Sequence, residues 1–293
     1  MKRALVLGGT RFFGKKLVEL LIDSDYRVTI LTRGNIENPF GDKVQHIVAD
    51  RADKEALRKA VGETFYDLAF DNICYSPNDA KALCEVLQGR VEKVVFTSTL
   101  STYELDGKAK VEEDFNPYDY PIRYGDVTDF TYGEGKKLAE AVFFKEAAFP
   151  VVAVRFPIVM DEDDYTRRLH TYIEMVRENK PILLQNVNAE MSFILAEEAA
   201  KFLKWVGENE VVGPYNATAN GKISLLELIH LIEKVTNIEA KVEEQTVEVT
   251  TPFDIPDSWY MKNDKAEKAG FQFSNLQDWL TPLIKRIYHL KAI

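Results

Sequence analysis

The sequence is poor in cysteine and in long apolar runs, and each shortage excludes a class of protein. Its 293 residues include two cysteines, Cys74 and Cys84. Two are too few for a disulfide framework and are typical of a reducing compartment. No run of about 18 uncharged apolar residues is present, so no membrane-spanning helix is expected. The first apolar run, residues 4–7, is shorter than the roughly 7 to 15 residues of a secretory signal. We therefore expect a cytoplasmic protein.

Histidine and positive charge are also scarce. None of the four histidines lies at metal-ligand spacing from another histidine or a cysteine, so no metal site is predicted. Lys and Arg total 37 against 47 Asp and Glu, which gives a net charge of −10. A nucleic-acid-binding surface needs clustered Lys and Arg, so this balance argues against such a partner. The ordinary share of hydrophobic residues, 46%, indicates a globular chain, and its length suggests about two domains.

Apolar runs alternate with helix-like segments through the first half of the chain. The strand-like runs cover residues 4–7, 27–31, 44–49, 67–73, 93–97 and 151–156. The helix-like segments cover residues 14–24, 54–61, 79–87 and 132–147, with Asp53 as a predicted N-cap of the second. Apolar strands separated by helices indicate βαβ units, whose right-handed crossovers build a doubly wound parallel sheet. The predicted fold is therefore an α/β Rossmann fold.

The pattern changes after the fifth strand and predicts a second, smaller part. Residues 104–131 are rich in Asp, Pro, Tyr and Gly, which suggests a long loop over one edge of a site. We expect a dinucleotide-binding domain made of residues 1–156 and about 189–218. A smaller α+β lobe, made of about 157–188 and 219–293, is expected to bind the substrate.

A glycine-containing turn, residues 8–14, lies where the first strand meets the first helix. Glycines at such a turn let the backbone approach a pyrophosphate, and the helix N-terminus supplies N–H groups. The competing interpretation, a phosphate-binding P-loop, is disfavoured because Lys16 stands where Ser or Thr must hold Mg²⁺. Arg11 occupies a position that is often glycine, and its guanidinium could pair with a phosphate or remain solvated. The predicted cofactor contacts of the turn are Gly8, Thr10, Arg11, Phe12, Phe13 and Gly14.

The ends of the second and third strands suggest which dinucleotide is bound. An NAD site usually carries Asp or Glu after the second strand, to accept from the ribose 2′-hydroxyl. This chain has Arg33 there, which would attract a 2′-phosphate, so NADP is preferred over NAD unless Arg33 is only a surface turn residue. Asp50 and Arg51 follow the third strand as further cofactor contacts. Asp50 could accept from the adenine amino group or cap the next helix.

Tyr132 and Lys136 are four residues apart in a predicted helix, so they share one helix face. A free phenol is a poor base at pH 7, but a nearby ammonium and a positively charged nicotinamide stabilise its anion. The spacing therefore predicts Tyr132 as general acid and base, with an exposed helical pair as the alternative. A second hydroxyl should orient the substrate at the carboxyl end of the fifth strand. The candidates are Thr97, Ser98, Thr99 and Ser101.

Six segments carry a family resemblance. They are GGTRFFG at 8–14, TSTLSTY at 97–103, YGEGK at 132–136, VRFPIV at 154–159, SFILAEEAA at 192–200 and GPYNAT at 213–218. With these segments the chain resembles the extended short-chain dehydrogenase/reductase family, the NAD(P)-dependent epimerases and dehydratases. The form of the glycine turn, together with TRG at 32–34, is similar to the branch that contains the chloroplast stem-loop-binding proteins.

The resemblance assigns roles to particular residues. Tyr132 and Lys136 take the family's base and lysine roles, and Lys136 would also hydrogen-bond the nicotinamide ribose. The resemblance places the active hydroxyl on Thr99 in preference to Ser98. Phe156 falls where the family touches the nicotinamide, and Ile73 lies beside the cofactor where the family has small residues. The resemblance also implies dimerisation through the helices that follow Tyr132 and Asp79.

The predicted function is that of an NAD(P)-dependent oxidoreductase, epimerase or dehydratase. Its substrate would be a secondary alcohol or ketone, sugar-like or nucleotide-sugar-like. The family often places an arginine for a sugar-nucleotide diphosphate before SFIL, but here Met191 stands beside Glu190. An acid and a thioether do not bind diphosphate, which weakens the prediction of a UDP-sugar. The alternative is a dinucleotide-binding regulatory or RNA-associated protein without turnover.

Overall fold

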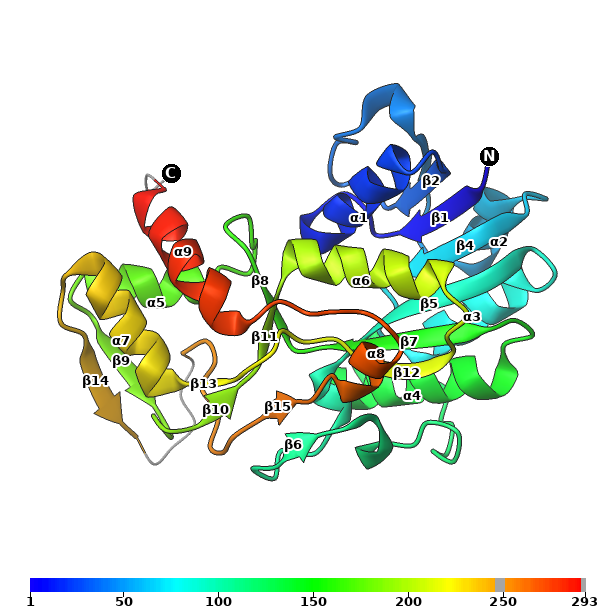
Figure 1. Cartoon of the computed structure of the whole chain (residues 1–293). Helices are drawn as coiled ribbons and strands as arrows, with labels where there is room; N and C mark the ends of the chain where they lie inside the picture. The colour runs from blue at the N-terminus through cyan, green and yellow to red at the C-terminus, as the bar shows by residue number, and fades with distance from the viewer. Residues whose placement is uncertain (246–250, 291–293) are drawn as a thin grey trace.

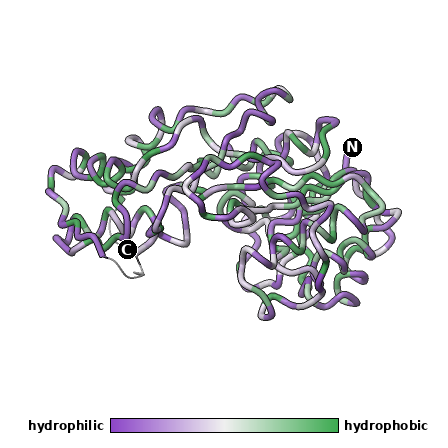
Figure 2. The backbone as a smooth tube through the Cα atoms, turned by 90° about the horizontal axis from the view of Figure 1, so that it is seen from below, coloured by the Kyte–Doolittle hydropathy of each residue, from purple (hydrophilic) through white to green (hydrophobic). Residues whose placement is uncertain are grey.

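The computed structural model describes residues 1–245 and 251–290. The end of the predicted second lobe, residue 293, lies outside this range. Figure 1 shows two parts side by side: a twisted sheet flanked by helices that carries the N-terminus, and a smaller lobe built around α5, α7 and α9. In Figure 2, hydrophobic (green) stretches run through the part of the molecule that carries the N-terminus, and hydrophilic (purple) stretches form many of the outer turns. No helix of the described residues is long and apolar enough to cross a membrane.

Seven parallel strands form the main sheet, which confirms the predicted doubly wound fold. Their order is β12 (Gly213–Asn216), β7 (Val151–Phe156), β5 (Val91–Thr99), β4 (Tyr66–Asp71), β1 (Arg3–Leu7), β2 (Arg27–Thr32) and β3 (Gln45–Val48). Strand β5 runs to Thr99, two residues beyond the predicted end. Strand β4 ends at Asp71 rather than at residue 73, because the Asp71 carboxylate accepts the N–H of Ile73 at 3.1 Å and turns the chain out of the sheet.

Helices cover both faces of this sheet because successive strand residues point to opposite sides. Val6 and Phe70 pack on the side of α1 (Phe12–Asp23) and α6 (Ala196–Glu208). Their neighbours Leu5 and Ala69 pack on the other side. That side is covered by α2 (Lys54–Val61), α3 (Pro77–Leu87) and α4 (Tyr132–Glu146).

The predicted N-cap of α2 is confirmed. The Asp53 side chain accepts the N–H groups of Glu55 and Ala56 at 3.0 and 3.1 Å. These are two of the backbone donors that the first turn of a helix leaves without partners. Helix α2 therefore begins where the sequence predicts.

A second hydrophobic cluster holds the smaller lobe together. Its helices are α5 (Arg168–Arg177), α7 (Leu225–Thr236) and α9 (Leu276–His289). Its short paired strands are β8 (Ile158–Met160) with β11 (Phe193–Leu195), β9 (Pro181–Leu184) with β14 (Lys241–Glu244), and β10 (Glu190–Met191) with β13 (Ile223–Ser224). Strand β15 (Tyr260–Met261) pairs with β6 (Ala109–Lys110), and the short helix α8 (Asp264–Lys268) follows. The lobe thus joins the sheet at several separate segments of the chain.

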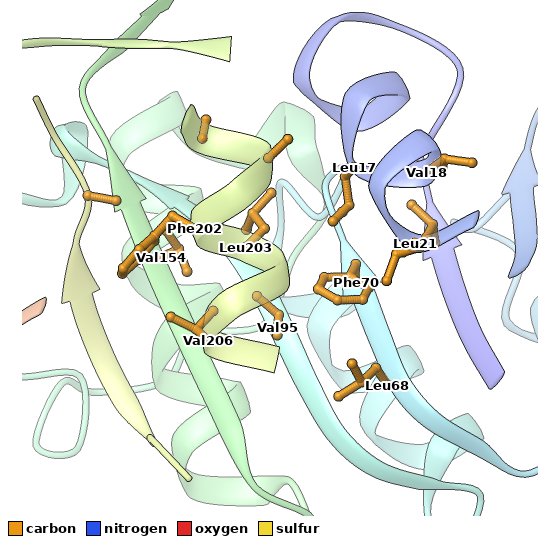
Figure 3. Packing of buried hydrophobic residues seen from close by; sticks show 14 of the residues in the cluster. Leu17, Val18, Leu21, Leu68, Phe70, Val95, Val154, Phe202, Leu203 and Val206 are labelled. Carbon is orange, nitrogen blue, oxygen red and sulfur yellow. The ribbon is translucent and has the colours of Figure 1, made fainter. Parts of the chain in front are cut away.

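The core between α6 and the sheet is the part of the fold shown in Figure 3. Phe202, Leu203 and Val206 project from α6 onto Phe70 and Val154 of the sheet, and all five side chains are fully buried. Burying a large apolar side chain contributes about 1.5–3 kcal/mol, so this layer is a main source of stability.

We expect Phe202→Ala to lower the free energy of unfolding by about 3–5 kcal/mol, because the change leaves a cavity between α6 and the sheet. Urea denaturation followed by circular dichroism measures this loss. The matched control is Phe65→Ala, at a side chain that is 50% exposed, which should change the stability by less than about 0.5 kcal/mol. Equal losses in the two variants would contradict this account of the core.

Candidate functional site

A cavity of about 490 Å³ opens at the carboxyl ends of β1, β2 and β4. The chain turns from β1 to β2 on one side and reaches β4 on the other, so this is the switch point where doubly wound sheets bind ligands. The structure brings ten of the predicted cofactor residues together in the cavity wall. They are Gly8, Thr10, Arg11, Phe12, Phe13, Gly14, Arg33, Asp50, Arg51 and Ile73.

The glycine turn leaves bare backbone at this cavity. Gly8 has a φ of +80°, in the left-handed region that favours glycine. A Cβ on Gly8 would overlap the side chain of Ile73, and one on Gly14 would lie 2.5 Å from the carbonyl oxygen of Gly8. A side chain is therefore excluded at Gly8 and at Gly14, and the backbone at these two positions is open to the close approach that a phosphate-bearing group requires.

Arg33 and Asp50 lie on the part of the wall formed by the ends of β2 and β3. Both are exposed, and no acidic side chain follows β2 directly. The Asp50 carboxylate accepts the N–H of Ala52 at 3.0 Å. Asp50 does not cap α2, so that alternative was wrong: the cap is Asp53, three residues nearer to the helix.

Arg51 is a structural part of the wall rather than a free cation. Its buried guanidinium lies 3.0 Å from the Asp71 carboxylate and donates to the carbonyl oxygen of Asp79 at 2.9 Å. Burial raises the pKa of Asp71, and the neighbouring Arg51 charge opposes that rise. The positive charge of Arg51 is therefore compensated within the protein. The described residues contain no group of three or more His, Cys, Asp and Glu side chains that could hold a metal ion.

Tyr132 and Lys136 border the cavity through the ring of Tyr75, which lines it. The Lys136 ammonium lies 4.7 Å from the centroid of the Tyr75 ring and 5.9 Å from that of Tyr132. Lys136 is buried and donates to the carbonyl oxygen of Thr97 at 2.7 Å, whereas Tyr132 is 54% exposed. Tyr132, Lys136 and Phe156 therefore stand beside the cavity and not in its wall; the Phe156 ring lies 5.8 Å from that of Phe13.

Two glycines explain how α4 comes so close to the strand ends. A Cβ on Gly133 would lie 2.5 Å from the carbonyl oxygen of Ser101, and one on Gly135 would overlap the carbonyl oxygen of Tyr75. The first turn of α4 therefore lies directly on the segments that follow β4 and β5. This contact places Tyr132 next to the end of β5.

The four candidate hydroxyls at the end of β5 have different partners. Thr97 donates to the Asn72 side chain at 2.7 Å, and Ser98 donates to the buried Glu140 carboxylate. The Thr99 hydroxyl lies 3.4 Å from that of Ser101 and accepts the N–H of Ser101 at 3.2 Å. Thr97 and Ser98 thus donate to side chains of other elements, whereas the partner of the Thr99 hydroxyl is the nearby Ser101.

A buried ion pair joins α4 to strand β7, and it was not predicted from the sequence. Arg155 donates to both carboxylate oxygens of Glu140, at 3.0 and 2.6 Å, and both side chains are fully buried. Arg155 also donates to the Tyr103 hydroxyl at 2.8 Å. Glu140 stands four residues after Lys136, so its position on the same helix face was the available signal. Asn72, which also donates to the carbonyl oxygen of Gly8 at 3.3 Å, was missed as well.

We expect Glu140→Gln to lower the free energy of unfolding by about 3–5 kcal/mol, because Arg155 would keep a buried charge without its counter-ion. Chemical denaturation measures the loss. Glu85→Gln is the control, since the Lys54–Glu85 pair at 2.7 Å is exposed on both sides and should contribute about 0–1 kcal/mol. A Glu140→Gln protein as stable as the control would contradict this role of the pair.

The sheet order and the glycine turn define a Rossmann-type dinucleotide fold, and the tyrosine and lysine at the start of α4 are the features by which the chain resembles the extended short-chain dehydrogenases/reductases. The sequence profile of the NAD dependent epimerase/dehydratase family matches residues 4–72, from β1 to the end of β4. The family resemblance predicted from the sequence is thus confirmed.

Individual proteins resemble the chain more distantly. It is 25% identical over 115 residues to the chloroplast stem-loop binding protein of 41 kDa b of Arabidopsis thaliana and 29% identical over 171 residues to the UDP-glucose 4-epimerase of Neisseria meningitidis serogroup C. These matches cover 35% and 48% of this chain, and the chain spans 30% and 47% of the two relatives. The structure of dTDP-glucose 4,6-dehydratase from Bacillus anthracis in complex with NAD superimposes with a TM-score of 0.79. That likeness covers 99% of this chain and 97% of the dehydratase at 15% identity, and it shows a shared fold.

Proposed function

We propose that this protein is an NAD(P)-dependent oxidoreductase, epimerase or dehydratase that acts on a secondary alcohol or ketone of a sugar-like substrate. One observation carries the proposal. Tyr132 and Lys136 meet the end of β5, which bears Thr99, beside a cavity that is lined by the glycine turn, residues 8–14. Proton exchange and dinucleotide binding would therefore take place next to each other.

The cavity wall fits a dinucleotide. The turn at residues 8–14 would hold the pyrophosphate, because its backbone can be approached closely at Gly8 and Gly14. Arg33 and Asp50 would contact the adenosine half, and Ile73 and Phe156 the nicotinamide half. A bound nicotinamide supplies the two-electron oxidation or reduction of the substrate carbon. The structurally similar dehydratase from Bacillus anthracis was solved in complex with NAD, which supports this assignment.

The protein residues move the proton that accompanies this redox step. Tyr132 would take the proton from the substrate hydroxyl, or return it to the ketone oxygen, as general base and acid. Thr99 would hold the same oxygen by a hydrogen bond. The Lys136 ammonium, 5.9 Å from the Tyr132 ring centroid, places a positive charge where negative charge develops on the phenol.

We expect Tyr132→Phe to lower the turnover rate by about 10²–10⁴-fold, because the ring stays in place while the proton-transferring hydroxyl is lost. The measurement is steady-state turnover with a substrate found by screening ketones and nucleotide-sugars. Tyr118→Phe, at a tyrosine that is 50% exposed and does not line the cavity, is the control and should keep its rate. Wild-type turnover in Tyr132→Phe would contradict the role of Tyr132 as general acid and base.

The cofactor preference rests on Arg33 in the cavity wall, and we propose NADP over NAD. Arg33→Asp should weaken NADP binding relative to NAD, because a carboxylate repels the 2′-phosphate that the guanidinium attracts. Fluorescence titration with NADPH and NADH gives the ratio of the two dissociation constants. Arg27→Asp is the matched control, since Arg27 begins the same strand at the opposite end. An unchanged ratio in Arg33→Asp would mean that Arg33 is only a surface residue.

Two residues in the second lobe bear on the substrate, which we propose binds between that lobe and the sheet. Glu190 forms an ion pair with Lys222, and Met191 is buried. Neither residue offers a cation to a diphosphate, which favours a sugar-like substrate that carries no diphosphate.

We further propose that the protein acts in the cytoplasm, where its two buried cysteines remain free thiols. A homodimer formed through α3 and α4 is part of the same proposal.

The similarity to the Arabidopsis stem-loop binding protein favours a second candidate, an RNA-associated protein that binds a dinucleotide without turnover. The net charge of −10 argues against it, because RNA phosphates require clustered Lys and Arg. An RNA-binding assay at several salt concentrations, run beside a dinucleotide titration, separates the two. RNA binding without dinucleotide binding would reverse the ranking.

A further inference from the structure

A loop of the second lobe reaches back over the glycine turn. This loop, residues 161–167, joins β8 to α5, and its Tyr165 lines the same cavity as residues 8–14. The Arg11 guanidinium lies 5.4 Å from the centroid of the Tyr165 ring, and the Phe12 ring meets it edge-on at 6.1 Å. Tyr165 is 60% exposed, so it stands at the mouth of the cavity and is not part of the core.

An ion pair holds the same loop against α1. The Lys16 ammonium lies 3.2 Å from the Asp161 carboxylate, and both side chains are largely shielded from water. Partial burial works to lower the pKa of Lys16, yet the Asp161 charge raises it above its usual value. The loop therefore contacts the turn region at two points, the Lys16–Asp161 pair and the packing of Tyr165 on Arg11 and Phe12.

The other side of the loop is bound to its own lobe. Glu162 lies 3.4 Å from Arg286 of α9, and its carbonyl oxygen lies 3.0 Å from Nε2 of His170 in α5. Within the loop, Asp164 accepts the N–H and the hydroxyl of Thr166 at 2.9 and 2.6 Å. The loop is thus an ordered connection between the second lobe and the dinucleotide cavity.

We infer that Tyr165 is a positioning residue that closes the cavity over a bound dinucleotide by holding Arg11 against its phosphates. This inference rests on the proposed function. A phosphate at the glycine turn would accept from the N–H edge of the Arg11 guanidinium, while the Tyr165 ring packs on the same guanidinium through a cation–π contact at 5.4 Å. Release of the dinucleotide then requires the 161–167 loop to lift, which breaks the Tyr165 packing and the Lys16–Asp161 pair. The second lobe thereby controls how long the dinucleotide stays bound.

The test is the release rate of bound NADPH or NADH, whichever the wild-type protein binds more tightly. The loaded protein is mixed with excess oxidised dinucleotide, and the loss of nicotinamide fluorescence is followed by stopped flow. Tyr165→Ala should release the dinucleotide about fivefold faster or more, because the cation–π and edge-on ring contacts are lost. Tyr165→Phe keeps the ring and should stay within about twofold of wild type.

Two further variants make the result specific. Asp161→Asn should release the dinucleotide about two- to fivefold faster, because it removes the charge that holds Lys16. Tyr118→Ala, at an exposed tyrosine outside the cavity wall, should release it at the wild-type rate. Because Tyr165 is exposed, the thermal unfolding midpoint of Tyr165→Ala without dinucleotide should match wild type, which separates clamping from a loss of fold.

The outcomes distinguish the inference from the proposed function. A wild-type protein that binds neither NADP(H) nor NAD(H) would contradict the proposed function, and the inference with it. Dinucleotide binding with the same release rate in Tyr165→Ala and wild type would overturn the clamp alone. Equally fast release from Tyr165→Phe and Tyr165→Ala would also overturn it, because the ring would then play no part.

Discussion

The arrangement of this site depends on the close contact between the first turn of α4 and the ends of β4 and β5. The contact requires that no Cβ be present at Gly133 and Gly135, where it would meet the backbone of the segments that follow the two strands. The buried Glu140–Arg155 pair holds the same helix against β7 about two turns further along. Because α4 cannot move away from the sheet, Tyr132 at its first position is fixed beside the end of β5.

The polar side chains around the cavity are of two kinds: some are bound to other groups of the protein and support the wall, and others are exposed to a ligand. Arg51, Asp71 and Asn72 are engaged with one another or with the backbone. Arg33 is exposed in the wall, and Arg11 contacts the ring of Tyr165. Buried charges need partners within the protein, whereas exposed ones keep their capacity to bind a ligand. This difference, more than the residue type, separates the supporting residues from the candidates for phosphate contact.

Much of the fold could be predicted from local patterns. Three features depend on residues that are close together in the chain: the strand and helix periods, the Asp53 cap and the glycine turn. Each can therefore be predicted from a short segment of sequence. The strand ends were less accurate: β4 stops at Asp71 because of a side-chain hydrogen bond that periodicity does not reveal. Tyr75 and Tyr165 were missed for a related reason, since nothing in their neighbouring residues shows that they face the cavity.

The sequence by itself determined the fold class, the position of the glycine turn and the spacing of Tyr132 and Lys136, because backbone propensity and helix periodicity act over a few residues. Only the tertiary structure decided that Arg51 is neutralised by Asp71, that Ser98 donates to Glu140 while Thr99 does not, and that Tyr165 of the second lobe lies over Arg11. Each of these pairs joins segments that are far apart in the chain. Their contacts arise when the βαβ crossovers and the second lobe bring those segments together.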